Sequence, residues 1–315
     1  MIDTAKVAYV FPGQGSQFPG MGRDLYDNFA SAKAIFQQAN EILKFPLSRL
    51  CFEGPEDELR LTINAQPALV TVSFACLKAI QETDGTGKLP APTFMAGHSL
   101  GEYTALAATD VIDFATAVYL ARERGRLMHE AGLKTAGGMA AIIGLDETGL
   151  NEVCQTTNTW IANFNCPGQM VISGSKENIE KAMELAKAKG AARAIPLQVS
   201  GAFHSPLMQP AKEGLATIIS RLTFKDPSVP VIANTTAQPL VRGEQIGPEL
   251  TAQLLNSVQW QRSIEFMIEN GVSTFIEIGP GKVLTGLIKR INRNANVMNI
   301  GDSEAIRNLA NPIPS

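Results

Sequence analysis

The chain has 315 residues, of which 45% are hydrophobic and 18% charged, and its net charge is −3. These values are typical of a soluble globular protein of one to three domains, and they give no reason to expect a nucleic acid or an anionic membrane as the main partner. No apolar run approaches the roughly 18 residues of a membrane span. The four cysteines are too sparse for a disulfide scaffold and lack paired metal-ligand spacing, which indicates a reducing cytoplasm and no metal site.

Strands and helices are expected to alternate through the first part of the chain. The apolar residues 7–11 end in Pro12-Gly13 and predict a strand buried on both faces of a parallel sheet. A second short strand is expected at 94–96. Helices are expected at about 21–43, at 67–80 with Pro67 in the first helical position, from 100 onward, and from 113 to about 130. This alternation favours an α/β fold.

The pattern changes after Gly137-Gly138. From there the chain predicts the order strand, helix, strand, strand, helix, strand, at about residues 139–143, 147–156, 160–164, 170–173, 176–189 and 192–198. This βαββαβ order is that of a ferredoxin-like unit. We therefore expect a small ferredoxin-like domain, residues 134–200, inserted into a larger α/β domain made of residues 1–133 and 201–315. The larger domain should resume with strands at 229–234 and 274–279, a helix at 283–291 and a short strand near 297.

The segment "GHSLG", residues 97–101, fits the G-x-S-x-G nucleophile elbow, with the required strand before it and helix after it. Glycines on both sides of Ser99 allow the sharp turn that would expose its hydroxyl near a helix N-terminus. Ser99 is therefore a candidate nucleophile. The alternative is a serine that only caps the helix.

A nucleophilic serine needs a base, and the chain has only three histidines. His98 is adjacent to the serine and should point away from it, and His129 lies in a charged helix. His204 lies where the small domain returns to the large one, and by elimination it is the candidate base. A hydrogen-bonded structural histidine is the alternative. No acidic third member can be assigned from spacing, so a Ser–His dyad is expected.

Two further features are compatible with more than one interpretation. The turn at residues 12–15 fails the G-x-G-x-x-G pattern because position 18 is Phe18, but it could present a backbone N–H to an oxyanion. A plain tight turn is the alternative. Arg122, Arg124 and Arg126 share one helix at a spacing of two, so they cannot all face a cleft, and periodicity does not decide which one could bind a carboxylate.

Four segments together, "FPGQGSQ", "GHSLGEYTAL", "GAFHS" and "VQW … IEIGPGKVLTGL", resemble the malonyl-CoA:acyl carrier protein transacylases over nearly the whole chain. The resemblance implies an α/β-hydrolase-like large domain with an inserted ferredoxin-like domain and an active site between them. It implies Ser99 as the acylated residue and His204 as its base. The backbone N–H groups of Gln14 and Leu100 would form the oxyanion hole, and the main-chain carbonyl of Gln253 would orient the histidine.

The same resemblance implies how the substrate is held. Arg124 matches the arginine that binds the free malonyl carboxylate, and Gln66 and Asn165 fall in segments that match the family's pocket. Phe203, before the histidine, together with Leu100, resembles the malonyl-selective members, although the first residue of "GAFH" departs from their commonest pattern.

The implied reaction is ping-pong malonyl transfer from malonyl-CoA to the phosphopantetheine thiol of acyl carrier protein, for fatty-acid or polyketide synthesis, by a cytoplasmic monomer without metal or bound cofactor. Because carrier proteins are acidic, a basic patch is expected to dock them, with Lys282, Lys289, Arg290 and Arg293 as candidates. These side chains could instead only face solvent at the end of a helix. A serine hydrolase or thioesterase, and a non-catalytic domain that docks carrier proteins, are the alternative functions.

Overall fold

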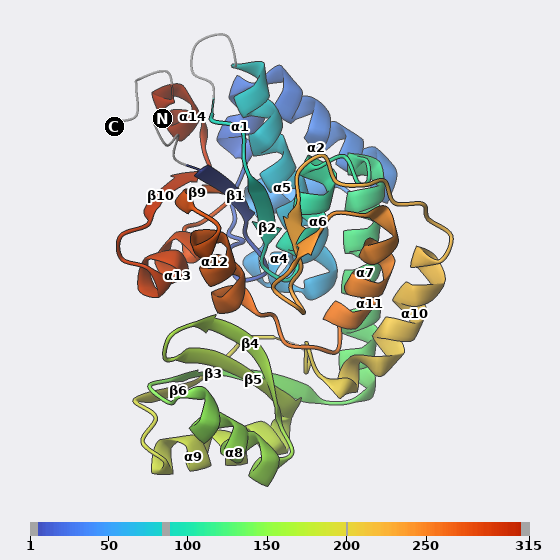
Figure 1. Cartoon of the computed structure of the whole chain (residues 1–315). Coiled ribbons are helices and arrows are strands. Elements are labelled where there is room, and N and C mark those ends of the chain that lie inside the picture. Colours follow the sequence, from blue (N-terminus) through green and yellow to red (C-terminus); the bar gives the residue numbers. More distant parts are fainter. Residues whose placement is uncertain (1–5, 84–88, 200, 310–315) are drawn as a thin grey trace.

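The structure of the chain, a computed structural model, describes residues 6–83, 89–199 and 201–309. Its main feature is a six-stranded sheet (Figure 1) in which five neighbouring strands run parallel and the edge strand β8 runs antiparallel to β7. In sheet order the strands are β10 (Asn296–Ile300), β9 (Val272–Ile278), β1 (Lys6–Phe11), β2 (Phe94–Gly97), β7 (Val231–Ile232) and β8 (Pro239–Leu240). The central strands β1 and β2 are almost entirely buried, as continuous apolar runs predict.

Helices cover both faces of this sheet (Figure 1). One face packs against α2 (Ala30–Leu43), α5 (Thr62–Glu82), α6 (Gly101–Ala108) and α7 (Phe114–Lys134), and the other against α12 (Trp260–Glu269) and α13 (Val283–Ile291). The other helices outside the region 137–196 are α1 (Arg23–Asn28), α3 (Leu47–Glu53), α4 (Glu56–Arg60), α10 (Gln209–Ile219), α11 (Ile246–Gln253) and α14 (Ser303–Asn308), with 3-10 turns η1 (Pro206–Met208) and η2 (Gly243–Gln245).

Two helix expectations for the N-terminal part were wrong. The single helix expected at 21–43 is divided into α1 and α2, because Phe29 between them is extended, with φ −129° and ψ 125°. The next helix does not begin at Pro67 but at Thr62, so the proline lies inside α5. Pro67 has no N–H for the carbonyl of Ile63, four residues earlier, and that carbonyl instead accepts a hydrogen bond of 2.9 Å from Arg122 Nη1. A side chain from a distant helix therefore makes the internal proline tolerable.

Helix α5 is the one described helix that is long and apolar enough to cross a membrane by length and composition. However, 89% of its most apolar window is buried inside the protein. It contributes Leu69, Val72 and Cys76, among others, to the core beneath the sheet. A buried central helix explains its composition.

A second, four-stranded sheet lies beside the first, at the bottom of Figure 1. Its elements follow in the order β3 (Gly137–Ile143), α8 (Glu147–Thr157), β4 (Trp160–Cys166), β5 (Gln169–Ser175), α9 (Lys176–Ala188) and β6 (Arg193–Pro196). The strands are antiparallel in the order β4-β5-β3-β6, and α8 and α9 cover one face with a separate apolar core. The Ser175 side chain caps α9, accepting a hydrogen bond of 3.2 Å from Asn178 N. The chain as a whole is thus a mixed α/β protein.

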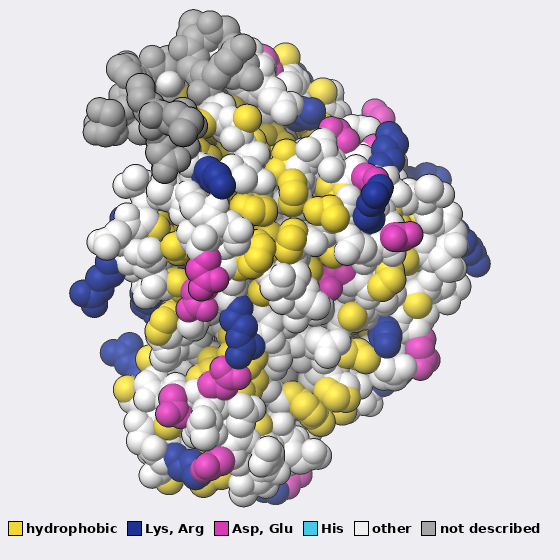
Figure 2. All heavy atoms as spheres, viewed as in Figure 1, with side chains coloured by type: hydrophobic (Ala, Val, Ile, Leu, Met, Phe, Trp, Pro, Cys, Tyr) yellow, Lys and Arg dark blue, Asp and Glu magenta, His cyan; other side chains and the backbone are white. Residues whose placement is uncertain are grey.

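The four-stranded sheet is joined to the segment before α12 by backbone hydrogen bonds as well as by the chain itself. Val258, which precedes α12, donates its N–H to Ala162 O on β4 at 2.8 Å and accepts from Phe164 N at 2.9 Å. On the face shown in Figure 2, basic and acidic side chains are scattered among one another and do not form a large patch of one sign. This distribution fits the small net charge of the chain.

Candidate active site

The turn from β2 into α6 places Ser99 at the carboxyl end of the parallel strands. Ser99 has φ 51°, a left-handed conformation that non-glycine residues seldom adopt. The flanking glycines are sterically required, because a Cβ on Gly97 would lie 1.8 Å from the carbonyl carbon of Gly101, and one on Gly101 would lie 2.1 Å from Phe11 O. The sequence therefore forms a strained elbow that holds the serine hydroxyl away from the sheet.

The turn after β1 lies against this elbow. Strands β1 and β2 pair in parallel up to Phe11 opposite Gly97, and a Cβ on Gly13 would lie 2.3 Å from His98 O. Gln14 and Leu100 both line the cavity around Ser99. Among the hydrogen bonds of the described residues, none uses the backbone N–H of either residue. Two unpaired donors at adjacent turns can therefore bind an oxyanion.

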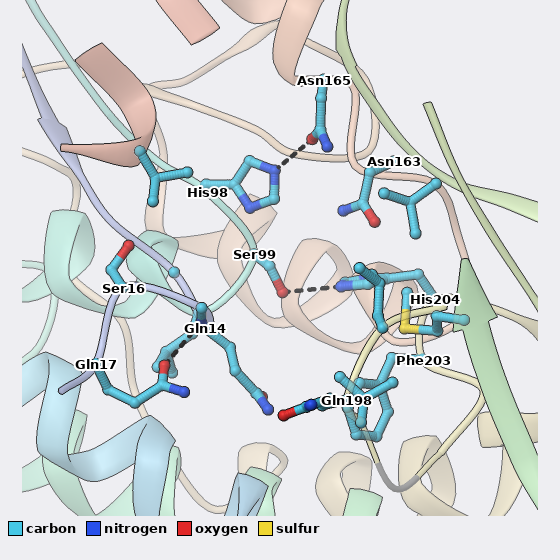
Figure 3. Close-up of a pocket in the computed structure, with 18 of the residues that line it drawn as sticks. Gln14, Ser16, Gln17, His98, Ser99, Asn163, Asn165, Gln198, Phe203 and His204 are labelled. Carbon is cyan, nitrogen blue, oxygen red and sulfur yellow. Dashed lines mark hydrogen bonds between the residues drawn. The ribbon is translucent and has the colours of Figure 1, made fainter. Parts of the chain in front are cut away.

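His204 reaches the serine from the segment that follows the four-stranded sheet. Its Nε2 lies 2.8 Å from Ser99 Oγ, and its Nδ1 lies 2.8 Å from the main-chain oxygen of Gln253, at the end of α11. A carbonyl oxygen can only accept, so Nδ1 carries the proton of the neutral ring and Nε2 is the acceptor for the serine hydroxyl. Figure 3 shows the two side chains facing one another across the cavity. The geometry is that of a serine with a general base.

The surroundings of His204 keep this ring neutral. Burial, and next the positive charge of Arg124, lower the pKa of His204 to about 3. The hydrogen bond to Gln253 O raises the pKa, but by less than these two effects lower it. At neutral pH the imidazole can therefore accept a proton.

Arg124 is the one of the three helical arginines that is buried beside Ser99, with 1% of its surface exposed. Its Nη2 donates to Ser99 Oγ at 3.2 Å and to Gln253 Oε1 at 2.8 Å, and its Nη1 donates to Gln66 Oε1 at 2.7 Å. Its Nε has no hydrogen-bond partner, and no salt bridge to it occurs within the described residues. A desolvated cation that no carboxylate contacts directly, at the floor of a cavity, is suited to binding an anion.

The other two arginines point elsewhere. Arg122 Nη1 donates to Asn64 Oδ1 at 2.6 Å and bonds the α5 carbonyl described above. Arg126 forms ion pairs with Glu123 and Glu130 on its own helix. Sequence spacing could not make this choice, because it depends on which helices α7 packs against.

A line of polar side chains runs from Arg124 to the turn after β1. Gln66 Nε2 donates to Thr62 Oγ1 at 2.7 Å, and Thr62 Oγ1 donates to Gln14 Oε1 at 3.0 Å. Arginine can only donate, so its bond to Gln66 Oε1 fixes the direction of each bond in this line. Gln66 is fully buried behind Arg124 and is not among the described residues that line the cavity, and its expected place in the substrate pocket stays a prediction.

The cavity around Ser99 has a volume of about 440 Å³ and lies between the two sheets. Apolar side chains near the dyad include Met128, Met139, Val171 and Phe203. Phe203 is 5% exposed, so most of its ring is packed against the protein and one surface bounds the cavity. The site is thus a partly apolar chamber with a cation at its floor.

His98 and Asn165 form a separate pair on another wall of the cavity (Figure 3). His98 Nε2 lies 2.9 Å from Asn165 Oδ1, and the ring meets Trp260 edge-on at 5.5 Å between centroids. Burial lowers the pKa of His98. As expected from its position next to the serine, this histidine does not serve Ser99.

The four basic residues expected to dock a carrier lie on or next to α13. Lys282, Lys289, Arg290 and Arg293 are all exposed, and α13 itself lines the cavity through Val283 and two leucines. Arg290 Nη1 also donates to Gln169 Oε1 on β5, so this side chain links α13 to the four-stranded sheet. None of the four reaches Ser99.

Two buried residues behind the dyad were not found from the sequence. Glu102 was not singled out as a site residue, and it is fully buried. Asn234, which follows β7, is 3% exposed and bonds the backbone of Ser99. The described residues contain no cluster of three or more His, Cys, Asp or Glu side chains that could hold a metal ion.

Comparison with known protein families identifies the class of protein to which the chain belongs. Residues 8–306 match the family described as the acyl transferase domain. The malonyl CoA-acyl carrier protein transacylase of Bacillus subtilis (strain 168) is 48% identical over 307 residues, which are 96% of this chain and 95% of that protein.

Two solved structures agree with the sequence comparison. The acyl-carrier-protein-S-malonyltransferase of Bartonella henselae is 42% identical, with a TM-score of 0.91 over 96% of this chain and 97% of that one. A malonyl-transacylase in complex with the holo acyl-carrier protein of a type II PKS is also 42% identical, with a TM-score of 0.92 over 97% and 99% of the two chains. The chain therefore belongs to the malonyl CoA-acyl carrier protein transacylase family of acyl transferases.

Proposed function

We propose that this protein transfers a malonyl group from malonyl-CoA to the phosphopantetheine thiol of acyl carrier protein, for fatty-acid or polyketide synthesis. Relatives named for this activity match nearly the whole chain, and one related enzyme is known in complex with its holo carrier protein. The observation that carries the proposal is Arg124, a buried cation whose Nη2 lies 3.2 Å from the hydroxyl of a serine paired with a histidine.

In the first half-reaction, Ser99 Oγ attacks the thioester carbonyl carbon while its proton moves to His204 Nε2. The oxyanion is stabilised by the backbone N–H groups of Gln14 and Leu100, a contribution that is typically worth about 10²–10³ in rate for each donor. The C–S bond then breaks, His204 returns its proton to the CoA sulfur, and the malonyl group remains as an ester on Ser99.

In the second half-reaction, the carrier-protein thiol attacks the malonyl ester and His204 takes its proton. The tetrahedral intermediate collapses with return of a proton to Ser99 Oγ, which restores the enzyme. Gln253 holds the imidazole through its main-chain oxygen, at 2.8 Å from Nδ1, in both steps. The serine itself carries the acyl group, so we infer that no bound cofactor or metal is needed.

Arg124 selects the substrate by binding the free carboxylate of malonate. Nη1 carries two hydrogens and uses one for Gln66, so the second can bond the carboxylate. Nη2 supplies the other bond by giving up its contact with Ser99 Oγ. Binding of the correct substrate thus also frees the nucleophile. Phe203, with the neighbouring methionines, limits the space for a substituent on the malonyl carbon.

The rest of the cavity is suited to the pantetheine arm, which CoA and the carrier protein share. Uncharged amide side chains line it, and these can exchange hydrogen bonds with the two amides of pantetheine. They are Gln17, Asn163, Asn165, Gln169 and Gln198. We further propose that Lys282, Lys289, Arg290 and Arg293, around α13, attract the acidic carrier protein.

We assign the architecture as an α/β-hydrolase-like domain, residues 1–133 and 201–315, with an inserted ferredoxin-like domain, residues 134–200. The parallel strand arrangement around the elbow supports the first assignment, and the antiparallel order β4-β5-β3-β6 supports the second. We expect a cytoplasmic monomer. The four cysteines are buried free thiols, which suits a reducing compartment, and size measurement in solution would test the oligomeric state.

The test is intact-mass measurement after mixing with malonyl-CoA. The wild-type protein should gain one malonyl group, lose it on addition of holo carrier protein, and transfer it to the carrier thiol. Ser99→Ala should gain none, and a persistent adduct would place the nucleophile elsewhere. Release of free malonate at a comparable rate without carrier protein would identify a hydrolase, and failure of the wild-type protein to acylate would indicate a non-catalytic docking domain.

A further inference from the structure

Asn234 lies directly behind the nucleophile turn and uses all four of its polar groups. Its Oδ1 accepts from Ser99 N at 2.6 Å, and its Nδ2 donates to Gly97 O at 2.7 Å. Its own N–H donates to Glu102 Oε1 at 3.0 Å, and its carbonyl accepts from Gln259 N at 2.8 Å. One side-chain amide therefore spans the elbow from the residue two before the serine to the serine itself.

This contact falls where the backbone is strained. Ser99 has φ 51°, and a conformation of this kind persists only where the surroundings determine it strongly. The neighbouring glycines allow the turn but do not favour it, because glycine has the widest choice of conformations. The two bonds from Asn234 are specific to the turned conformation, since they fix the N–H of Ser99 and the C=O of Gly97 at the same time.

The bond to Ser99 N has a second effect. The N–H of a nucleophilic serine could itself stabilise an oxyanion, but here that hydrogen already points to Asn234 Oδ1, on the side away from the cavity. The oxyanion is then left to the unpaired N–H groups of Gln14 and Leu100, the two residues that line the cavity beside it.

Glu102 connects this support to the base. Its Oε1 accepts from Asn234 N, and its Oε2 accepts from Gln253 Nε2, whose residue orients His204 through its main-chain oxygen. Gln253 Nε2 also donates to Ser99 O at 3.0 Å. A single buried carboxyl group thus joins the segment that holds the nucleophile to the segment that holds the imidazole.

We propose that Asn234 is a positioning residue that holds Ser99 in its reactive conformation and removes the Ser99 N–H from the oxyanion site, with Glu102 tying it to Gln253. This inference rests on the proposed function, because it assumes that Ser99 is the acylated residue. It concerns the rate of acylation and predicts little change in the binding of malonyl-CoA.

The experiment compares single-turnover acylation by malonyl-CoA, followed by intact mass, in the wild type and in variants at this position. Asn234→Ala should acylate about 10²-fold more slowly with little change in KM, as expected when a reacting atom is displaced by about 1 Å. The matched control is Asn40→Ala. Asn40 also makes two side-chain amide bonds, accepting from the backbone N of Ser48 and donating Nδ2 to the Oγ of the same serine, but it lies outside the cavity, and its loss should leave the rate unchanged.

Asn234→Asp gives a readout that a general loss of stability would not produce. An ionised aspartate can still accept from Ser99 N, but its second oxygen would face Gly97 O, and two acceptors repel. When protonated, that oxygen can donate to Gly97 O and restore the original pattern. The acylation rate of this variant relative to wild type should therefore rise as the pH falls from about 8 to about 6, because burial raises a carboxyl pKa.

The outcomes separate this inference from the function on which it rests. If the wild-type protein fails to acylate, the proposed function is wrong. If the wild type acylates and Asn234→Ala does so at a similar rate, or its crystal structure retains φ near the native value at Ser99, the positioning role is refuted. If Asn234→Ala does not fold, the near-isosteric Asn234→Asp decides, and a rate ratio independent of pH would overturn the inference.

Discussion

Replacing Arg124 with alanine should reduce malonyl transfer far more than acetyl transfer. The guanidinium is buried, forms no salt bridge among the described residues, and has two terminal nitrogens that can bond a carboxylate. A hydrogen bond to a charged group contributes about 1.5–3 kcal/mol, so two such bonds correspond to roughly 10²–10⁴ in kcat/KM. One of the hydrogens must first leave Ser99 Oγ, so we expect a loss near the lower limit, about 10²-fold.

The assay measures kcat/KM with malonyl-CoA and with acetyl-CoA for the wild type, Arg124→Ala and Arg124→Lys. Acetyl has no carboxylate, so its transfer should fall only through the loss of the arginine's contacts with Gln253 and Ser99. Lysine keeps the charge without the planar fork and should give an intermediate value. Arg126→Ala, on the same helix and paired at the surface, is the control that should resemble wild type. Equal losses on both substrates would refute the assigned role.

Three further predictions concern the base, the elbow and the docking surface. Because the pKa of His204 is lowered to about 3, its ring stays unprotonated as the pH falls. The single-turnover acylation rate should therefore be constant from about pH 8 to about pH 5 and fall only near pH 3–4. A fall in rate centred near the usual histidine pKa would contradict this prediction. Gly101→Ala should lower the free energy of unfolding by more than about 4 kcal/mol. The control is Gly286→Ala, at an exposed position on α13 with open space around it, which should raise the free energy of unfolding by about 0.5–1 kcal/mol. Similar denaturation midpoints for the two variants would show that the elbow is not tightly packed. Lys289→Glu should raise the KM for carrier protein and leave that for malonyl-CoA unchanged, with Lys181→Glu on α9 as control; an unchanged KM would remove Lys289 from the docking surface.

The elements with a strong local signal could be predicted from the sequence. The sequence predicted buried strands around residues 7–11 and 94–96 and the βαββαβ order, and the structure contains all of them. These predictions were possible because continuous apolar runs and the spacing of apolar residues depend directly on which side chains are buried. The start of α5 was missed because its internal proline is tolerated through Arg122, a residue almost 60 positions away in the sequence. No local pattern contains that contact.

The residues of the candidate site likewise include some with a local sequence signal and some without one. Ser99 carries a motif whose glycines have steric causes, and His204 was found because few histidines compete with it. The buried support of the dyad has no such signature. Glu102 lies three residues after the serine in the sequence and carries no motif, yet its carboxyl accepts bonds from Asn234 and Gln253, which approach from two other segments. Burial by distant segments is a tertiary property, and one residue's type does not reveal it.

The division of the cavity between two sheets bears on how such an enzyme could acquire a new acyl preference. The reacting groups and their buried supports lie at the end of the parallel sheet, on the helices that cover it and in the segment after β6, whereas Met139 on β3, Asn163 on β4 and Val171 on β5 form the facing wall. Mutations on that wall can widen or narrow the chamber while the hydrogen bonds of Glu102 and Asn234 stay intact. The length of the acyl group that the enzyme accepts can therefore change during evolution, or be engineered, while the reaction chemistry stays the same.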